Sequence, residues 1–195
     1  MGRELTGAAY AGRDQSPGEK RLTDLVPTPP TCHNADMLFT TADLSDQHGD
    51  SVRVAEPVFS DFGLRKTFSG PVTTVEAPGD YSLVAAAIDE TGAGRVLVID
   101  GAGARDCALL GDRLAFLAYQ HNWAGVVVYG SVRDSGELQS IDIGIKALGT
   151  YPRRGMKAGR GQRDIPVTFA GVLFRPGDWV YADQDGLIVA DSKLT

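Results

Sequence analysis

Two apolar runs and the amphipathic segment between them are the clearest pattern in this chain. Residues 95–100 and 124–129 are dominated by apolar side chains, which is typical of central strands that are covered on both faces of a sheet. Between them, residues 112–121 place Leu114 and Leu117 on one face at helical spacing. A helix between two such strands predicts a right-handed parallel crossover.

The remaining patterns extend this alternation. Further helices are predicted over residues 41–46, with Thr41 as the cap, and over residues 81–88. Pro71 is expected at the start of its strand, where a missing backbone donor is tolerated. The other predicted strands cover residues 51–59, 70–77, 141–149, 165–170, 172–174, 179–182 and 187–189. Together these elements predict an α/β domain with a mixed central sheet and a β-rich second layer.

The amino-terminal part of the chain has a different composition. Residues 1–34 are rich in Gly, Pro, Thr and charged residues and show no sustained apolar period. Such a segment buries too little apolar surface to order itself. We therefore predict a disordered extension, or a misassigned start, over residues 1–36 and one folded domain over residues 37–195.

Composition and charge narrow the class of protein. A chain of 195 residues with 43 % hydrophobic residues fits one globular domain. The formal net charge of −6 argues against a nucleic-acid-binding surface, which is normally basic. Cys32 and Cys107 lie far apart in unlike contexts, so no disulfide or metal knuckle is predicted. No run reaches the roughly 18 apolar residues of a membrane span, and no secretory signal is found, so a cytoplasmic protein is expected.

Two local motifs resemble known ligand-binding loops, and each has a simpler structural explanation. Gly101-Ala102-Gly103 follows a predicted strand as a dinucleotide loop would, but Asp106 stands where the third glycine is needed. A tight turn at the strand end is the favoured interpretation. Residues 183–186 resemble the start of a calcium loop, yet the glycine and the closing glutamate do not fall at the required spacing. A hairpin turn is predicted there instead.

Isolated histidines and a basic loop add no further candidate. No motif surrounds any of the three histidines, which are His33, His48 and His121. A solvated loop is a better interpretation than an RNA-binding patch for the basic residues Arg153, Arg154 and Lys157.

Two short stretches are complementary in chemistry. Gly111-Asp112-Arg113-Leu114 reads as the amino end of a helix, whose unpaired N–H groups and dipole can hold a carboxylate. Residues 130–134 read as the loop after a buried strand, with the Arg133 fork for a carboxylate or an enolate oxygen and Asp134 for a hard metal ion. If both open onto one pocket, they suit a small anionic substrate beside a divalent metal. A surface ion pair at a strand end is the alternative.

The chain resembles the RraA-like family, which includes the 4-hydroxy-4-methyl-2-oxoglutarate aldolases. The resemblance runs from about Thr40 to Ala190. Its motifs stand in order along the chain as residues 58–63, 68–71, 96–101, 111–115, 130–134, 141–147 and 176–178. Ordered agreement over nearly the whole domain is specific for the family and less specific for activity.

The resemblance implies a swivelling β/β/α fold and a homotrimer with active sites near the subunit boundaries. Aldolase members cleave 4-hydroxy-4-methyl-2-oxoglutarate or 4-carboxy-4-hydroxy-2-oxoadipate to pyruvate and a second keto acid, decarboxylate oxaloacetate, and use magnesium or manganese. By the same resemblance, residues 111–114 (Gly111, Asp112, Arg113 and Leu114) bind the substrate carboxylate. Arg133 contacts substrate and enolate, and Asp134 holds the metal. A metal ion and an arginine together supply the fixed positive charge that an enolate requires.

Other members of the family point to a second class of function. Some RraA proteins bind ribonuclease E or its helicase partners and inhibit RNA processing without chemistry. In the binding-only members the acidic residue after the arginine is replaced, whereas this chain keeps Arg133-Asp134. That favours an enzyme over an inhibitor. A methyltransferase label is also attached to this family, but the turn at Gly101 alone gives it little support.

Overall fold

The computed structural model describes residues 39–195. The predicted extension over residues 1–36 and the domain start at residue 37 lie outside the described residues, as do Cys32 and His33. Across residues 39–195, none of the helices has both the length and the apolar composition needed to cross a membrane.

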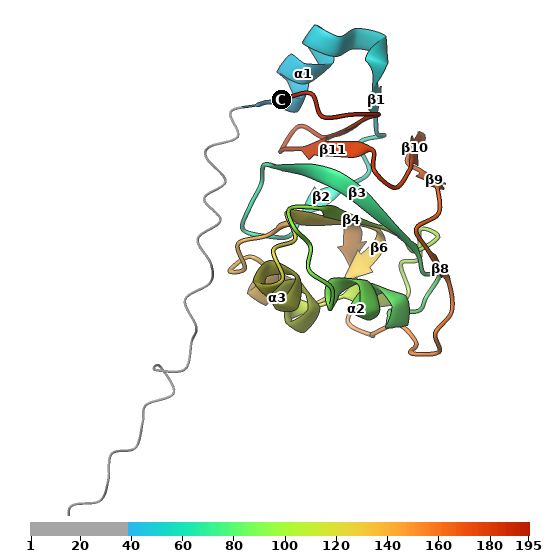
Figure 1. The fold of residues 1–195 in the computed structure, drawn as a ribbon. Coiled ribbons are helices and arrows are strands. Elements are labelled where there is room, and N and C mark those ends of the chain that lie inside the picture. The colour runs from blue at the N-terminus through green and yellow to red at the C-terminus, as the bar shows by residue number, and fades with distance from the viewer. Residues whose placement is uncertain (1–38) are drawn as a thin grey trace, which may run out of the picture. The chain divides into compact units, whose positions relative to one another are not determined.

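Short helices and strands alternate along the described part of the chain (Figure 1). The helices are α1 (Thr41–His48), α2 (Ser82–Ile88), α3 (Asp112–Gln120) and α4 (Ser135–Leu138), with a 3₁₀ turn at Gly49–Ser51. The strands are β1 (Val52–Val54), β2 (Ser60–Asp61), β3 (Phe68–Glu76), β4 (Val96–Asp100), β5 (Ala108–Leu110), β6 (Gly125–Val132), β7 (Gly144–Thr150), β8 (Gln162–Arg163), β9 (Val167–Phe169), β10 (Val172–Phe174), β11 (Trp179–Ala182) and β12 (Leu187–Ala190).

Most strands belong to one mixed sheet. Its main order is β1-β12-β11-β3-β4-β6-β7-β2, with β5 beside β6 and β8 beside β3. Strands β3, β4, β6 and β7 run parallel, whereas β11 and β12 continue the sheet in antiparallel fashion. β9 and β10 form a separate hairpin. The predicted α/β fold, with a mixed central sheet and a β-rich second layer, is confirmed, and so is the parallel pairing of residues 95–100 with 124–129.

The central strands are covered on both faces, as their apolar runs predicted. Leu97 and Ile99 of β4 pack into the cluster that also contains residues of α2 and α3. Val96 and Val98 point the other way, into the cluster formed with β9, β10, β11 and β12. Figure 1 shows α2 and α3 together on one side of β4 and β6, with β11, which belongs to the antiparallel part of the same sheet, on the other side. Because both faces of the sheet are covered, the loops of interest for a binding site are those that follow β4, β5 and β6.

Three predicted boundaries were wrong. Thr40, rather than Thr41, caps α1, because its hydroxyl accepts a hydrogen bond from the Asp43 N–H at 3.0 Å. The strand predicted over residues 51–59 forms only at β1, and the chain then runs to the two-residue strand β2. Pro71 lies inside β3 rather than at its start. It is tolerated there because the pairing of β3 with β4 begins one residue later, at Val72.

The loop predicted over residues 130–134 is only two residues long before α4 begins. β6 continues through Val132, because Ser131 and Val132 pair with the unpredicted strand β5 on one side and with β7 on the other. The predicted loop residues Gly130 and Ser131 therefore belong to the strand. Only Arg133 and Asp134 leave it, directly beside the end of β5.

A buried aspartate joins α1 to the hairpin between β11 and β12. Asp183 begins the hairpin turn predicted at residues 183–186, and its N–H donates to the Gly186 carbonyl at 3.1 Å. Its carboxylate accepts hydrogen bonds from Thr41 N (2.6 Å), Thr41 Oγ1 (2.7 Å) and Asp185 N (2.9 Å). Burial alone would raise the pKa of Asp183, but these donors outweigh it and lower the pKa below its ordinary value.

Acidification is expected to weaken the fold through Asp183. A carboxyl whose folded pKa is depressed stabilises the protein above the unfolded value of about 4, and this contribution is lost as the pH falls below it. Asp183→Asn presents an NH₂ group to the Thr41 donors and should cost about 2 kcal/mol at pH 7. Urea unfolding between pH 7 and pH 3 measures both effects. An unfolding midpoint equal to wild type at pH 7, or an unchanged pH dependence, contradicts this role.

Candidate functional site

One pocket brings together several loops at the carboxyl ends of the parallel strands. It has a volume of about 360 Å³ and lies between α2, β5, the start of α3 and the loop over residues 151–161. Its walls are formed by Tyr81, Ala85, Ala86, Asp89, Ala108, Leu109, Leu110, Gly111, Asp112, Arg113, Leu114, Leu117, Arg133, Arg154 and Lys157. The charged residues of this wall are four cations and two carboxylates, so the pocket favours an anion.

The predicted helix start lies in this pocket. Gly111 is the N-cap of α3 in an extended conformation, and no side chain caps the helix. The first N–H groups of a helix have no partner within it and carry the positive end of its dipole. The structure therefore places residues 111–114 on the pocket wall, at the positive end of α3.

The end of β6 lies directly beside this helix start. The Arg133 N–H donates to the Leu110 carbonyl at 3.0 Å, immediately before Gly111. The Arg133 Nε lies 3.3 Å from the Asp134 Oδ2, and both side chains are about one-third exposed. Asp134 adopts a left-handed conformation, with φ 56° and ψ 42°, at the N-cap of α4, but its side chain does not cap that helix. The Asp134 carboxylate is therefore held beside Arg133 and is not used by the helix that follows.

Gly111 is the contact point between the two elements. A Cβ atom at this position would lie 2.6 Å from the Asp134 Oδ2 and 3.2 Å from the Arg133 Nε. Real Cβ atoms essentially never approach other atoms as closely as the first of these distances. The absence of a side chain at Gly111 allows the carboxylate, the guanidinium and the helix start to share one place.

A divalent metal ion fits this place only as a largely hydrated ion. No group of three or more His, Cys, Asp or Glu side chains that could hold a metal is found among residues 39–195. Asp134 offers hard carboxylate oxygens, and Mg²⁺ commonly keeps several waters with one or two carboxylates. The donor set therefore suits magnesium or manganese rather than a tetrahedral zinc site. Unlike Arg133, Asp134 does not belong to the pocket wall itself.

The solvated loop predicted for Arg153, Arg154 and Lys157 is confirmed by their exposure, but the prediction did not place Arg154 and Lys157 at the pocket. Both side chains are exposed, yet both line the pocket. The Arg154 guanidinium lies 5.0 Å from the ring centroid of Tyr81, which is also a wall residue. The available signal was a cluster of basic residues in a glycine-containing loop of an acidic chain, but the sequence does not show which face such a loop covers.

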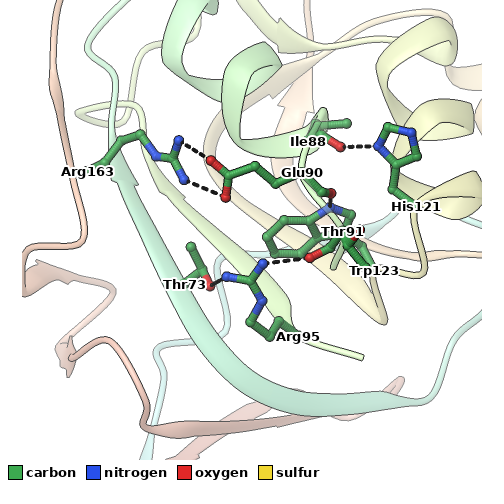
Figure 2. Close-up of polar contacts among 8 residues, drawn as sticks. All are labelled: Thr73, Ile88, Glu90, Thr91, Arg95, His121, Trp123 and Arg163. Atoms are coloured by element: carbon green, nitrogen blue, oxygen red, sulfur yellow. Dashed lines mark hydrogen bonds and ion pairs between the residues drawn. The ribbon is translucent and has the colours of Figure 1, made fainter. Parts of the chain in front are cut away.

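The other motifs keep their simpler interpretations. At the turn after β4, Gly101 N and Gly103 N donate to the Tyr129 carbonyl, and Ala102 N donates to the Asp100 carboxylate. These N–H groups are committed, so they offer no cradle for a nucleotide phosphate. His121 makes a structural contact, because its Nδ1 lies 2.8 Å from the Ile88 carbonyl oxygen (Figure 2).

Comparisons with known proteins show which family this chain resembles. The family model described as RraA-like, Aldolase/RraA, matches residues 41–189. A protein of Alkalilimnicola ehrlichii named "Putative 4-hydroxy-4-methyl-2-oxoglutarate aldolase" is 54 % identical over 81 % of this chain and 98 % of its own length.

Two solved structures share the fold closely. The RNA-processing inhibitor RraA from Thermus thermophilus is 41 % identical, with a TM-score of 0.79 over 82 % of this chain and 96 % of that one. A Geobacillus kaustophilus protein described as an S-adenosylmethionine:2-dimethylmenaquinone methyltransferase is 46 % identical, with a TM-score of 0.79 over 80 % of this chain and 97 % of that one.

Proposed function

The chain belongs to the RraA-like family, and from this premise we propose that it is a lyase, a metal-dependent class II aldolase. Its substrate is 4-hydroxy-4-methyl-2-oxoglutarate or the related 4-carboxy-4-hydroxy-2-oxoadipate, and it also decarboxylates oxaloacetate. The names of its relatives support the aldolase class. The observation that carries the proposal is the meeting of a helix amino end, Arg133 and Asp134 around Gly111.

Binding of the keto acid uses two elements of the pocket. The N–H groups at the start of α3 hold the carboxylate next to the keto group without needing a charged side chain. The Arg133 guanidinium lies on the adjacent wall and can donate to the keto oxygen. This arrangement fixes the end of the substrate that becomes pyruvate.

Bond cleavage places negative charge on that keto oxygen. In the aldol substrate, the hydroxyl at C4 loses its proton, the C3–C4 bond breaks and its electrons form the pyruvate enolate. In oxaloacetate, loss of carbon dioxide leaves the same enolate. Arg133 provides fixed positive charge as the enolate develops, and protonation at C3 completes pyruvate. A magnesium or manganese ion held by Asp134 would supply further charge as a Lewis acid.

The test of this function is release of pyruvate by the purified full-length protein. With magnesium or manganese, we expect pyruvate from both oxaloacetate and 4-hydroxy-4-methyl-2-oxoglutarate, and we expect chelation to stop it. Pyruvate can be measured by coupling to NADH oxidation. No release from either substrate above the rate with metal alone contradicts the proposal.

A homotrimer in the cytoplasm, with keto acids as ligands, completes the proposal. The exposed apolar side chain of Phe116 on α3 and that of Met156 in the loop over residues 151–161 support a subunit contact near the pocket. In such a trimer, residues of the partner subunit would complete the pocket wall beside Asp134, which does not itself line the pocket.

Ribonuclease E inhibition is the second candidate, favoured by the likeness to the Thermus thermophilus inhibitor. A pull-down with ribonuclease E at physiological salt tests it directly. Capture of ribonuclease E, with no pyruvate released in the assay above, would favour inhibition over catalysis.

A further inference from the structure

The pocket contains two groups of cations, and the proposed chemistry uses only one of them. Arg133 comes from the end of β6 and lies beside the helix start at Gly111, and Arg113 belongs to that helix start. Arg154 and Lys157 come from the loop over residues 151–161 and line the same pocket. An aldol substrate of this class carries a second carboxylate, remote from its keto acid end.

We propose that Arg154 and Lys157 form a second carboxylate subsite, which binds the remote carboxylate of the aldol substrate, and that Asp80 positions their loop. This inference rests on the proposed lyase function. It assigns specificity-determining residues that the cleavage step itself does not require.

Strand β5 connects the two subsites. On one side β5 pairs with β6, which ends at Arg133. On its other side Ala108 N donates to the Arg153 carbonyl at 2.8 Å, and Gly155 N donates to the Ala108 carbonyl at 2.9 Å. Because one short strand is hydrogen-bonded to both flanking segments, the distance between Arg133 and Arg154 is fixed by backbone structure.

Lys157 lies between two anchored positions. Met156 N donates to the Gly79 carbonyl at 2.8 Å, on the amino-terminal side of Lys157. On the carboxyl-terminal side, the Asp80 Oδ2 accepts hydrogen bonds from Ala158 N at 2.8 Å and Arg160 N at 3.0 Å. The Lys157 backbone is thereby fixed on both sides.

Asp80 is suited to this anchoring role. It is fully buried, and its Oδ1 accepts a further hydrogen bond from Ser82 N at 2.8 Å. Burial would raise the pKa of Asp80, but the hydrogen bonds from Ser82, Arg160 and Ala158 outweigh it and hold the pKa far below its ordinary value. Asp80 therefore accepts hydrogen bonds from backbone N–H groups of both α2 and the loop.

The loop is also anchored at its far end. Figure 2 shows Arg163 forming a two-point ion pair with Glu90, which follows α2. The two N–O distances are 2.7 and 3.1 Å. The Glu90 carbonyl in turn accepts a hydrogen bond from the Trp123 Nε1 at 3.1 Å. With anchors at Ala108, Asp80 and Glu90, the loop presents its cations from a defined backbone.

The chemistry of the substrates separates the two subsites. In 4-hydroxy-4-methyl-2-oxoglutarate the remote carboxylate stays in the second product, so its binding to Arg154 and Lys157 persists throughout cleavage. In oxaloacetate the second carboxylate leaves as neutral carbon dioxide, and fixed cations on it would not favour the reaction. The second product is itself pyruvate, because the C4 fragment keeps the methyl group and the remote carboxylate, so pyruvate can occupy either subsite.

Lys157→Met and Arg154→Met in the full-length protein test the subsite. We expect each to lower kcat/KM for 4-hydroxy-4-methyl-2-oxoglutarate by about tenfold or more, mainly through KM. Oxaloacetate decarboxylation should stay within about threefold of wild type, because it does not use this subsite. Arg160→Met is the matched control, since it removes a cation from the same loop outside the pocket wall.

Asp80→Asn should reproduce the selective rise in KM for the aldol substrate. The carboxylate accepts from the loop with Oδ2 and from Ser82 N with Oδ1, whereas an amide has one oxygen and must turn its NH₂ group toward one of these two sets of donors. Equal loss on both substrates would instead show a merely structural role for Asp80. Unchanged kcat/KM for the aldol substrate in both Lys157→Met and Arg154→Met would overturn the subsite. Failure of the proposed function is distinct, because the wild-type protein then releases pyruvate from neither substrate.

Discussion

Replacement of Arg133 with alanine is expected to lower kcat for pyruvate release by about 10³-fold, because it removes the fixed charge next to the developing enolate oxygen. The side chain is one-third exposed, and its ion pair with Asp134 at 3.3 Å adds little to stability. We therefore expect thermal unfolding close to that of wild type. Measuring both kcat and thermal unfolding of Arg133→Ala separates an effect on catalysis from an effect on folding.

Two further variants make this result specific. Arg133→Lys keeps the charge but loses the planar fork, so it should recover only part of the activity. Arg105→Ala removes an exposed arginine outside the pocket wall and should leave the rate unchanged. If Arg133→Ala retains a rate within about fivefold of wild type, Arg133 has no role in stabilising the enolate.

Gly111→Ala is expected to reduce activity by about 10²-fold without changing any charged group. The added methyl would lie 2.6 Å from the Asp134 Oδ2, so the carboxylate must move away from Arg133 and the helix start. The measurement is pyruvate release at saturating metal and substrate. Reduced metal affinity, measured as the Mn²⁺ concentration for half-maximal rate, should accompany the loss.

Gly136→Ala is the matched control for this substitution. Gly136 lies nearby in α4, and a Cβ atom there meets nothing within 4 Å. We expect unchanged activity and metal dependence, because the methyl points into open space. Full activity of Gly111→Ala would mean that Asp134 and Arg133 need not meet at Gly111, and the site geometry would have to be abandoned.

The sequence predicted the central layers well, because long apolar runs depend little on context. Residues 95–100 and 124–129 could be identified as strands buried on both faces, and the structure places them next to each other in parallel. The helix at residues 112–121 was equally clear from its period. The predicted start at Gly111 agrees with the observed N-cap.

Elements defined by distant partners could not be predicted in the same way. β5 has only three residues and forms because it lies beside β6, which it also extends through Val132. The sequence favoured a loop at Gly130 and Ser131, since glycine and serine are common in turns. Tertiary pairing overrode that local preference.

The residues of the candidate site also differ in whether a local sequence pattern or a distant partner positions them. The sequence brought residues 111–114 and Arg133 together because they stand at the ends of regular elements, and the structure places them at one pocket. That Arg154 and Lys157 line the same pocket could not be predicted, because hydrogen bonds to Ala108 and Asp80, far away in the sequence, fix their loop. No local pattern carries that information.

Metal-dependent pyruvate release is the most direct test of the proposed lyase activity, and Asp134→Asn is its decisive variant. With oxaloacetate and Mn²⁺, we expect pyruvate formation by the wild-type protein, loss of that activity on chelation, and its restoration by added Mn²⁺. Asp134→Asn should be inactive at the same metal concentration while remaining folded. Wild-type activity that persists in chelator, or undiminished activity of Asp134→Asn, would contradict a metal-assisted lyase at this site.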